Sequence, residues 1–268
     1  MKTLKKIAVA TTLAAIATSA LAHRQWILPS TSILSGEDQW ISVEAAISNN
    51  LYFPNHHAIA LDNITVLGPS GQELEKQSTA QGKIRSTFEL QLEASGSYRI
   101  FSGRAGMFAS WEEDGERKRK RGSAEEFAAM DLASMDKLQL RENASRVETI
   151  VTSGAPSEIA VSGTGLEFEF ITHPNDLFTG EPASFRVLLN GEPTAGVEVT
   201  FVQGNDRFRN EAGDQTLVSD ENGLVEIEWP QAGRYWINAS SSIAGGDFHG
   251  VPLERSASYT LTVEVLPE

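Results

Sequence analysis

The sequence contains no cysteine, and this absence removes several classes of chemistry. Without thiols the chain has no disulfide framework, no Cys-based zinc site and no cysteine nucleophile. Its cores must therefore be built by side-chain packing alone. Positive charge is also scarce, since 22 Lys and Arg face 36 Asp and Glu and give a formal net charge of −14. This balance argues against nucleic acid or an anionic membrane surface as the main partner.

Long apolar runs are missing beyond the first residues of the chain. The start reads MKTLKKIAVATTLAAIATSALA and has the parts of a secretory signal: lysines, a short apolar run over 7–17 and the small-x-small site Ala20-Leu21-Ala22. We therefore predict a signal peptide over residues 1–22 and a mature protein that is exported to the periplasm. Because no second apolar stretch is long enough to span a bilayer, we expect no integral membrane protein.

Helical patterns are rare, and most segments alternate apolar and polar residues between turn signals such as GPSG, LNGEP and SDENG. This period of two is typical of mainly β proteins built from immunoglobulin-like sandwiches. The expected strands cover 39–47, 63–68, 86–93 and 98–103 in the first half, and 166–171, 183–190, 197–204, 224–229, 234–240 and 258–266 in the second.

Residues 123–140, SAEEFAAMDLASMDKLQL, are the exception and predict a helix. Ser123 and Glu126 have the spacing of a capping box. The partial apolar stripe that follows includes Met130 and Met135. We interpret these methionines as packing residues rather than as copper(I) ligands.

The segment 152–165, TSGAPSEIAVSGTG, is rich in small residues and predicts a domain boundary near residue 160. An N-terminal β-sandwich would then cover 23–160, with the helical insertion near 123–140, and a C-terminal one 161–268. The basic run GERKRKRG over 115–122 is unusual in so acidic a chain. We interpret it as a solvated hairpin tip, and the alternative is a docking loop, 117–121, for an acidic partner or a lipid headgroup.

The five histidines are the natural ligands for a borderline metal in a chain without thiols. Cleavage after Ala22 would place His23 at the new N-terminus, where it offers an imidazole and an α-amine whose pKa is ~7.7–8. His56 and His57 would face opposite sides of a strand, but Pro54-Asn55 before them indicates a turn in which both side chains can converge.

His173 and His249 complete the set of predicted metal ligands. His173 precedes Pro174 and reads either as a structural histidine between the domains or as a ligand that faces the first domain's histidines. His249 lies in the Gly-rich segment AGGDFHGVP, where Asp247 is placed to orient it. Imidazoles with an amine suit Ni, Co, Cu(II) or Zn, and the affinity order favours copper.

Several segments together resemble one known family, the domain of unknown function family 4198. They are AHRQWILPS at 22–30, FPNHHAIALDNITVLGPSG at 53–71, THPNDLFTGEPASFRVLLNGEPTAGVEVTFVQGNDRFR at 172–209, SDENGLVEIEWPQAGRYWINAS at 219–240 and SYTLTVEVLP at 258–267. The resemblance implies an exported protein of a Gram-negative bacterium, with immunoglobulin-like or transthyretin-like β-domains and no established catalysis. Members are sometimes labelled as the periplasmic component of a nickel or cobalt uptake system.

The resemblance also bears on individual residues. Members often begin mature life with a histidine, a place that His23 holds here. Their FFPDHH-like segment is matched by Phe53–His57 and their THPND segment by Thr172–Asp176, whereas His249 inherits little.

Three hypotheses follow. The first is a non-catalytic protein that binds a metal ion and passes it to a membrane transporter or an outer-membrane receptor. The second is an adaptor that binds a membrane transporter or another protein through its β-sandwiches, without a metal. The third is a copper oxygenase that uses His23 as an N-terminal histidine brace.

Overall fold

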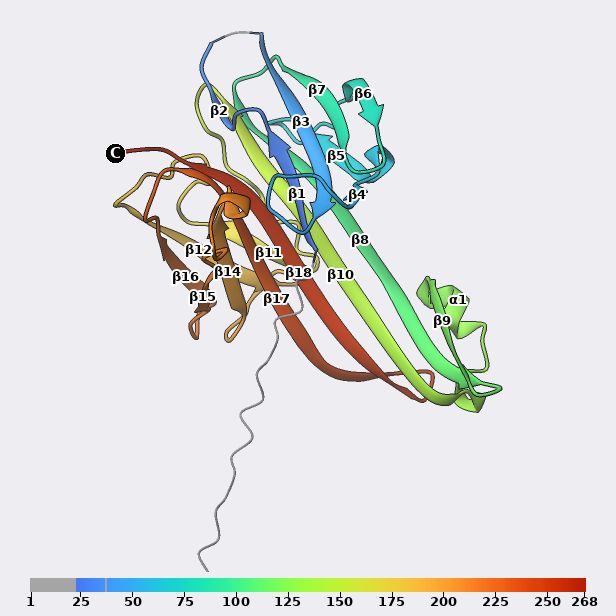
Figure 1. The fold of residues 1–268 in the computed structure, drawn as a ribbon. Helices are drawn as coiled ribbons and strands as arrows, with labels where there is room; N and C mark the ends of the chain where they lie inside the picture. Colours follow the sequence, from blue (N-terminus) through green and yellow to red (C-terminus); the bar gives the residue numbers. More distant parts are fainter. Residues whose placement is uncertain (1–22, 37) are drawn as a thin grey trace, which may run out of the picture.

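The computed structural model describes residues 23–36 and 38–268 and has the predicted fold class, mainly β with two β-sandwiches (Figure 1). The predicted signal peptide over 1–22 lies outside the described residues. In the described part of the chain, no helix has the length and apolar character needed to cross a membrane.

Strands account for most of both halves of the chain. The first half contains β1 (Arg24–Pro29), β2 (Ile33–Leu34), β3 (Gln39–Ser48), β4 (His57–Ala58), β5 (Ile64–Leu67), β6 (Gln77–Gln81), β7 (Ser86–Leu92), β8 (Gly96–Glu113), β9 (Glu116–Gly122) and β10 (Asp136–Ser153). The second half contains β11 (Leu166–Phe170), β12 (Pro182–Leu189), β13 (Glu192–Pro193), β14 (Glu198–Gln203), β15 (Gln215–Val218), β16 (Leu224–Glu228), β17 (Gly233–Phe248) and β18 (Val251–Val265). The helical elements are α1 (Ala124–Ala128) and the 3-10 turns η1 (Leu61–Asn63), η2 (Leu132–Ser134) and η3 (Asp206–Phe208).

Each sandwich buries its own apolar core. In the first, the sheet β1-β3-β7-β6, with β4 beside β3, packs on β5 and on the proximal parts of β8 and β10. In the second, β11, β12, β13 and β16 pack on β14, β17 and β18. The inward side chains alternate along each strand, and Phe88 and Leu90 of β7 and Phe185 and Val187 of β12 are almost fully buried.

One sheet runs through both sandwiches. Residues 140–149 of β10 pair in parallel with 253–262 of β18, which gives the strand order β15-β14-β17-β18-β10-β8-β5. The predicted boundary near residue 160 lies in the connection between β10 and β11, and it stays a prediction because the shared sheet spans both halves.

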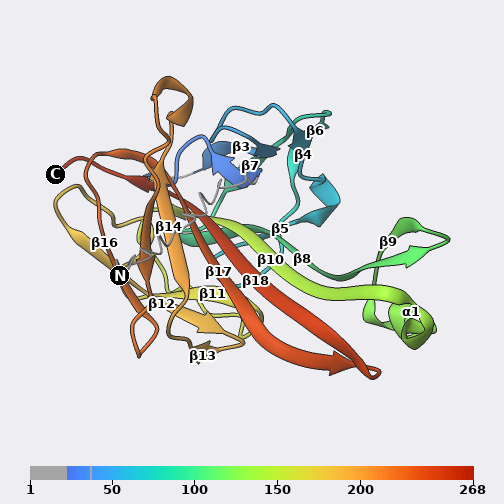
Figure 2. The same cartoon turned by 60° about the horizontal axis from the view of Figure 1, so that its bottom comes forward.

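The four longest strands continue beyond the sandwiches and form what we call the arm (Figures 1 and 2). The arm comprises the distal parts of β8, β10, β17 and β18, together with β9 and α1. A small core that includes Met107, Phe127, Leu140 and Leu253 covers one of its faces.

Each expected strand is present, but the predicted helix over 123–140 is much shorter than expected. The capping box is confirmed, since the Ser123 hydroxyl accepts a hydrogen bond from the Glu126 N–H at 3.2 Å and the Glu126 carboxylate accepts one from the Ser123 N–H at 2.7 Å. The α-helix nevertheless ends at Ala128. Residues from Asp136 onward pair with β8 instead, because tertiary strand pairing outweighs local helix propensity. Met130 and Met135 pack beside the arm's small core, as expected.

The basic run differs from its predicted form as well. The hairpin turn is made by Asp114 and Gly115, both at positive φ, and the run itself is an ordered edge strand, β9, paired with β8.

Candidate metal centre

Three of the five histidines meet at one end of the first sandwich, and we call them the histidine cluster. The His23 and His56 rings are stacked, with centroids 3.8 Å apart and planes 9° apart. The His56 and His57 rings are 4.1 Å apart and tilted by 45°. The structure therefore brings together the predicted first mature residue and the predicted histidine pair.

Strand β3 positions this cluster because it pairs on both sides. On one side Arg24 of β1 lies opposite Ser48, and on the other His57 of β4 lies opposite Ile47. His23, which directly precedes β1, and His57 of β4 therefore lie at the same end of β3.

The loop between β3 and β4 reverses the chain and carries His56. Tyr52 adopts a left-handed conformation with φ of 61°, and the side-chain oxygen of Asn55 accepts hydrogen bonds from the Ser48 hydroxyl at 2.6 Å and the Asn49 N–H at 3.2 Å. The turn predicted from Pro54-Asn55 is therefore part of a loop that hydrogen bonds hold to the end of β3. In this loop the adjacent rings of His56 and His57 converge.

The second half of the chain braces this loop through η3. The buried Asp206 carboxylate accepts the Leu51 N–H at 3.0 and 3.1 Å. Phe53 meets Phe208 edge to face at 5.4 Å, and the Arg207 guanidinium lies 5.4 Å from the Phe53 ring. The cluster thus rests on contacts from both sandwiches.

Arg24 holds the backbone next to His23 in place. The Arg24 guanidinium donates two hydrogen bonds of 2.7 Å to the Asp214 carboxylate and lies 5.1 Å from the Trp236 ring. The indole N–H of Trp236 in turn donates to the Gln25 carbonyl at 3.0 Å. Sequence reasoning missed these anchors, because nothing local in the sequence relates Arg24 to a carboxylate 190 residues away.

The electrostatics of the cluster favour a neutral imidazole at His56. Partial loss of water around the His56 ring, together with repulsion from His23 and His57, holds its pKa below the ordinary value. Neutral imidazole is the form that binds a metal ion.

The donor type fits a borderline metal, but the ring orientations are not those of a bound site. Within residues 23–36 and 38–268, no group of three or more His, Cys, Asp or Glu side chains has an arrangement that holds a metal ion. Stacked rings direct their nitrogens along parallel planes, whereas a shared ion requires nitrogens that point at one centre. His23 and His57 are exposed, so their side chains have room to adopt other rotamers.

His173 lies apart from the cluster, between the two sandwiches. Its Nδ1 accepts the Asn175 N–H at 3.1 Å, and its Nε2 lies 3.0 Å from the Ser97 hydroxyl of β8. Burial lowers the pKa of this half-buried imidazole. Both ring nitrogens therefore have partners within the protein.

His249 lies still farther away, in the turn that joins β17 to β18 at the end of the arm. Its φ is 52° and its ring rests on Phe248 at 4.6 Å, while Asp247 accepts the Gly250 N–H at 2.8 Å. The path along β17 from Trp236, beside the cluster, to Phe248 spans roughly 40 Å at about 3.3 Å per residue. His249 is thus not brought to the other histidines.

The comparison with protein families gives one match. The model of the family described as Domain of unknown function (DUF4198) matches residues 20–243. None of the curated proteins matches the chain.

Solved structures resemble the chain only distantly. A DUF4785 family protein from Legionella pneumophila subsp. pneumophila has 10% identity and a TM-score of 0.26, over 80% of this chain and 50% of that one. This chain therefore spans about half the length of the Legionella protein. The D0-D1 domain of Intimin has 14% identity and a TM-score of 0.22 over 90% of this chain and 97% of that one. Trypsin-activated alpha-2-macroglobulin from Escherichia coli has 12% identity and a TM-score of 0.22 over 90% and 16%. These scores are too low to indicate a shared function.

Proposed function

We propose that this chain, which belongs to the DUF4198 family, is an exported protein that binds a divalent transition-metal ion and assists its uptake or delivery without catalysis. Nickel or cobalt is the proposed cargo, with copper and zinc as competitors for the same donors. The observation that carries the proposal is the convergence of His23, His56 and His57, which come from separate parts of the sequence and lie in ring contact.

Export would complete the donor set. Removal of residues 1–22 would convert the His23 backbone nitrogen from a peptide nitrogen into an amine with a pKa of ~7.7–8, which a metal ion can deprotonate near neutral pH. One amine and up to three imidazoles then lie at one place. Such nitrogen-rich sets suit Ni, Co, Cu(II) and Zn.

The anchors of the cluster support a defined site rather than a free chain end. The hydrogen bonds between Arg24 and Asp214 fix the backbone beside His23, so less ordering remains to be done when an ion binds. His23 and His57 also stay exposed, which leaves the ion accessible to the membrane transporter or receptor that we propose as the partner.

The test is a metal titration of the processed protein. The untagged protein is purified from the periplasm, its first residue is identified by mass, and Ni, Co, Cu and Zn are titrated by calorimetry. We expect one stoichiometric site with a Kd below about 1 μM, equivalent to about −8.2 kcal/mol. His23→Ala and His57→Ala should each weaken it at least about tenfold, a loss of about 1.4 kcal/mol. His249→Ala is the matched control and should leave it unchanged.

Two results would overturn the proposal. Binding that survives His23→Ala in a correctly processed chain would remove the cluster as the site. Failure of all four metals to bind would remove metal carriage as the function.

A further inference from the structure

Five arginines share one face of the arm, and we call this surface the arginine face. They are Arg104 of β8, Arg117, Arg119 and Arg121 of β9, and Arg141 of β10. Register places them together, since paired residues share a face and so do residues two apart along a strand. Arg121 and Arg141 both lie opposite Phe108, one on each side of it.

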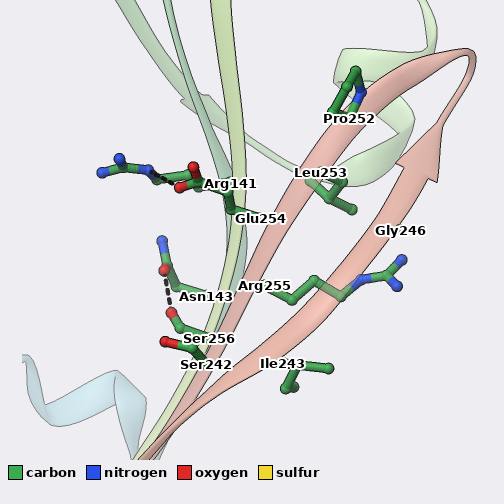
Figure 3. A pocket seen from close by; sticks show the side chains of 10 residues that line it. All are labelled: Arg141, Asn143, Ser242, Ile243, Gly246, Pro252, Leu253, Glu254, Arg255 and Ser256. Carbon is green, nitrogen blue, oxygen red and sulfur yellow. Dashed lines mark hydrogen bonds and ion pairs between the residues drawn. The ribbon is translucent and has the colours of Figure 1, made fainter.

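Side-chain contacts confirm this assignment. The Arg121 guanidinium lies 5.8 Å from the Phe108 ring, and Arg117 donates to the Ser110 hydroxyl at 3.0 Å. Figure 3 shows Arg141 on one side of the sheet and Leu253 on the other. The small core with α1 covers the Leu253 side, whereas the described residues leave Arg104, Arg119 and Arg121 of the arginine face exposed.

The arginine face carries uncompensated positive charge on an acidic chain. Among the residues that the structure describes, Arg141 is the one member with a carboxylate partner, Glu254 at 2.8 Å. Arg104, Arg119 and Arg121 are exposed and form no ion pair in that part of the chain. Cations gathered on one face attract a ligand of opposite charge.

A hollow of about 630 Å³ lies within this face. Arg104, Arg121 and Arg141 line it together with Phe108 and Asn143, and Gly106 leaves its floor without a side chain. A Cβ placed on Gly106 would approach only the Gly122 carbonyl oxygen, at 3.6 Å. Guanidinium forks and a side-chain amide are the groups that bind carboxylates through several hydrogen bonds.

The edge of the sheet beside the hollow is open as well. In the described structure β9 pairs only with β8, so its other edge offers backbone N–H and C=O groups. Its five consecutive basic residues repel a second copy of the same strand. The same residues favour an added strand with acidic side chains, because opposite charges across neighbouring strands attract.

The surface chemistry favours a protein segment over a lipid bilayer. The large apolar side chains that are exposed in the described residues all lie outside the arm: Trp40, Ile84, Val161, Ile171, Phe208 and Val218. In the part of the arm whose side chains are described, no large apolar side chain is thus exposed enough to insert readily into a bilayer, and an anionic membrane would repel the chain as a whole at its net charge of −14.

We propose that an acidic, extended segment of a partner protein docks on the arginine face. It adds to the open edge of β9 and directs its carboxylates to Arg119 of β9 and to Arg104 and Arg121, which line the hollow. This surface uses no member of the histidine cluster, so the proposal stands independently of metal binding.

The experiment compares two fluorescent peptides as long as β9. One alternates Glu with Thr and the other alternates Gln with Thr, and anisotropy reports their binding to the full chain. We expect the Glu peptide alone to bind, with an affinity that falls as salt rises. Arg119→Glu should weaken binding at least tenfold, whereas Lys83→Glu, the same charge change on an exposed residue outside the arm, should not.

A second variant tests the hollow without changing charge. Gly106→Val fills its floor in an extended strand that tolerates a β-branched residue, and it should also weaken the Glu peptide at least tenfold. Three results would each overturn the proposal: equal binding of the two peptides, an equal loss with Lys83→Glu, or binding of anionic vesicles and not of the Glu peptide.

Discussion

The imidazole of His23 lies flat against that of His56, with the ring centroids 3.8 Å apart. Two protonated imidazoles at this separation would repel each other strongly, so the stack is stable only when at least one ring is neutral. The contact therefore links the protonation of the chain's predicted first mature residue to that of the loop after β3.

We predict that His56 stays neutral to a lower pH than an ordinary histidine. Its pKa is lowered by loss of water and by repulsion from His23 and His57, so His23→Ala should move this pKa back toward its usual value. Metal affinity of the wild type should fall as the pH drops through ~7.7–8, where the His23 α-amine takes up a proton, and competition at the His56 ring should add to this loss only below its lowered pKa. NMR titration of the ring protons measures the shift. An unchanged His56 titration in His23→Ala would contradict the stack.

Arg24→Ala should weaken metal binding without unfolding the protein. The change frees the backbone at His23 by removing the two hydrogen bonds to Asp214. Ordering it again on binding costs about 0.5–1.5 kcal/mol, which is about twofold to tenfold in Kd. Calorimetry gives the affinity, and urea unfolding should show a loss of about 1–3 kcal/mol that leaves the chain folded, because Arg24 is largely buried and its guanidinium also lies 3.9 Å from the buried Asp206 carboxylate. Asp214→Asn should reproduce the effect, and unchanged affinity in both variants would count against anchoring.

Glu148→Ala should be among the most destabilising single changes in the chain. This fully buried carboxylate accepts from Arg99 at 2.6 Å and from the Tyr259 hydroxyl at 2.8 Å, and it lies 3.0 Å from Arg146. Removing it leaves two guanidiniums without their anion, at a cost of about 3–5 kcal/mol. Urea unfolding measures the loss.

The matched control for this change is Glu169→Ala. It breaks a more exposed pair with Arg186 and should cost less than about 1 kcal/mol. Similar losses in the two variants would show that burial of the Glu148 network contributes little.

His173→Ala should lower stability and leave metal affinity unchanged. Its Nδ1 accepts the Asn175 N–H, and a half-buried donor without its acceptor costs about 1–3 kcal/mol. His249→Ala, on an exposed turn, should change stability by less than about 0.5 kcal/mol. Thermal unfolding and calorimetry separate the two effects, and a loss of metal binding in His173→Ala would return this residue to the ligand set.

The strands could be predicted because burial alternates along them, as in β7, where Phe88 and Leu90 face the core and Glu89 faces solvent. The arm could not. Its distal residues, such as Arg141 and Asn143 of β10, are polar and lack the apolar pattern that marks a half-buried strand. Their pairing with β18 joins residues more than a hundred positions apart, and such a pairing cannot be predicted from a short stretch of sequence.

Part of the candidate site could also be predicted from the sequence, because its signal is local. His56 and His57 are adjacent and follow a turn signal, so their convergence was a local inference. The partner that fixes His23, by contrast, is Asp214 in the second sandwich, and its role depends on the three-dimensional arrangement of both halves. The local sequence thus indicates the histidines that could bind a metal ion, whereas the residues that hold them in place, such as Asp214, are known only from the tertiary structure.

The parallel pairing of β10 with β18 also sets an order of assembly. Until residues 251–265 have been synthesised, β10 has a neighbour on only one side along residues 140–149, and the sheet of the first sandwich keeps an open edge there. Strand β18 therefore pairs with β10 and completes a sheet that the first half of the chain begins. The N-terminal half can therefore complete its sheet only after β18 has been synthesised. A chain that ends before β18 exposes the unpaired edge of β10, which can pair with other chains and aggregate.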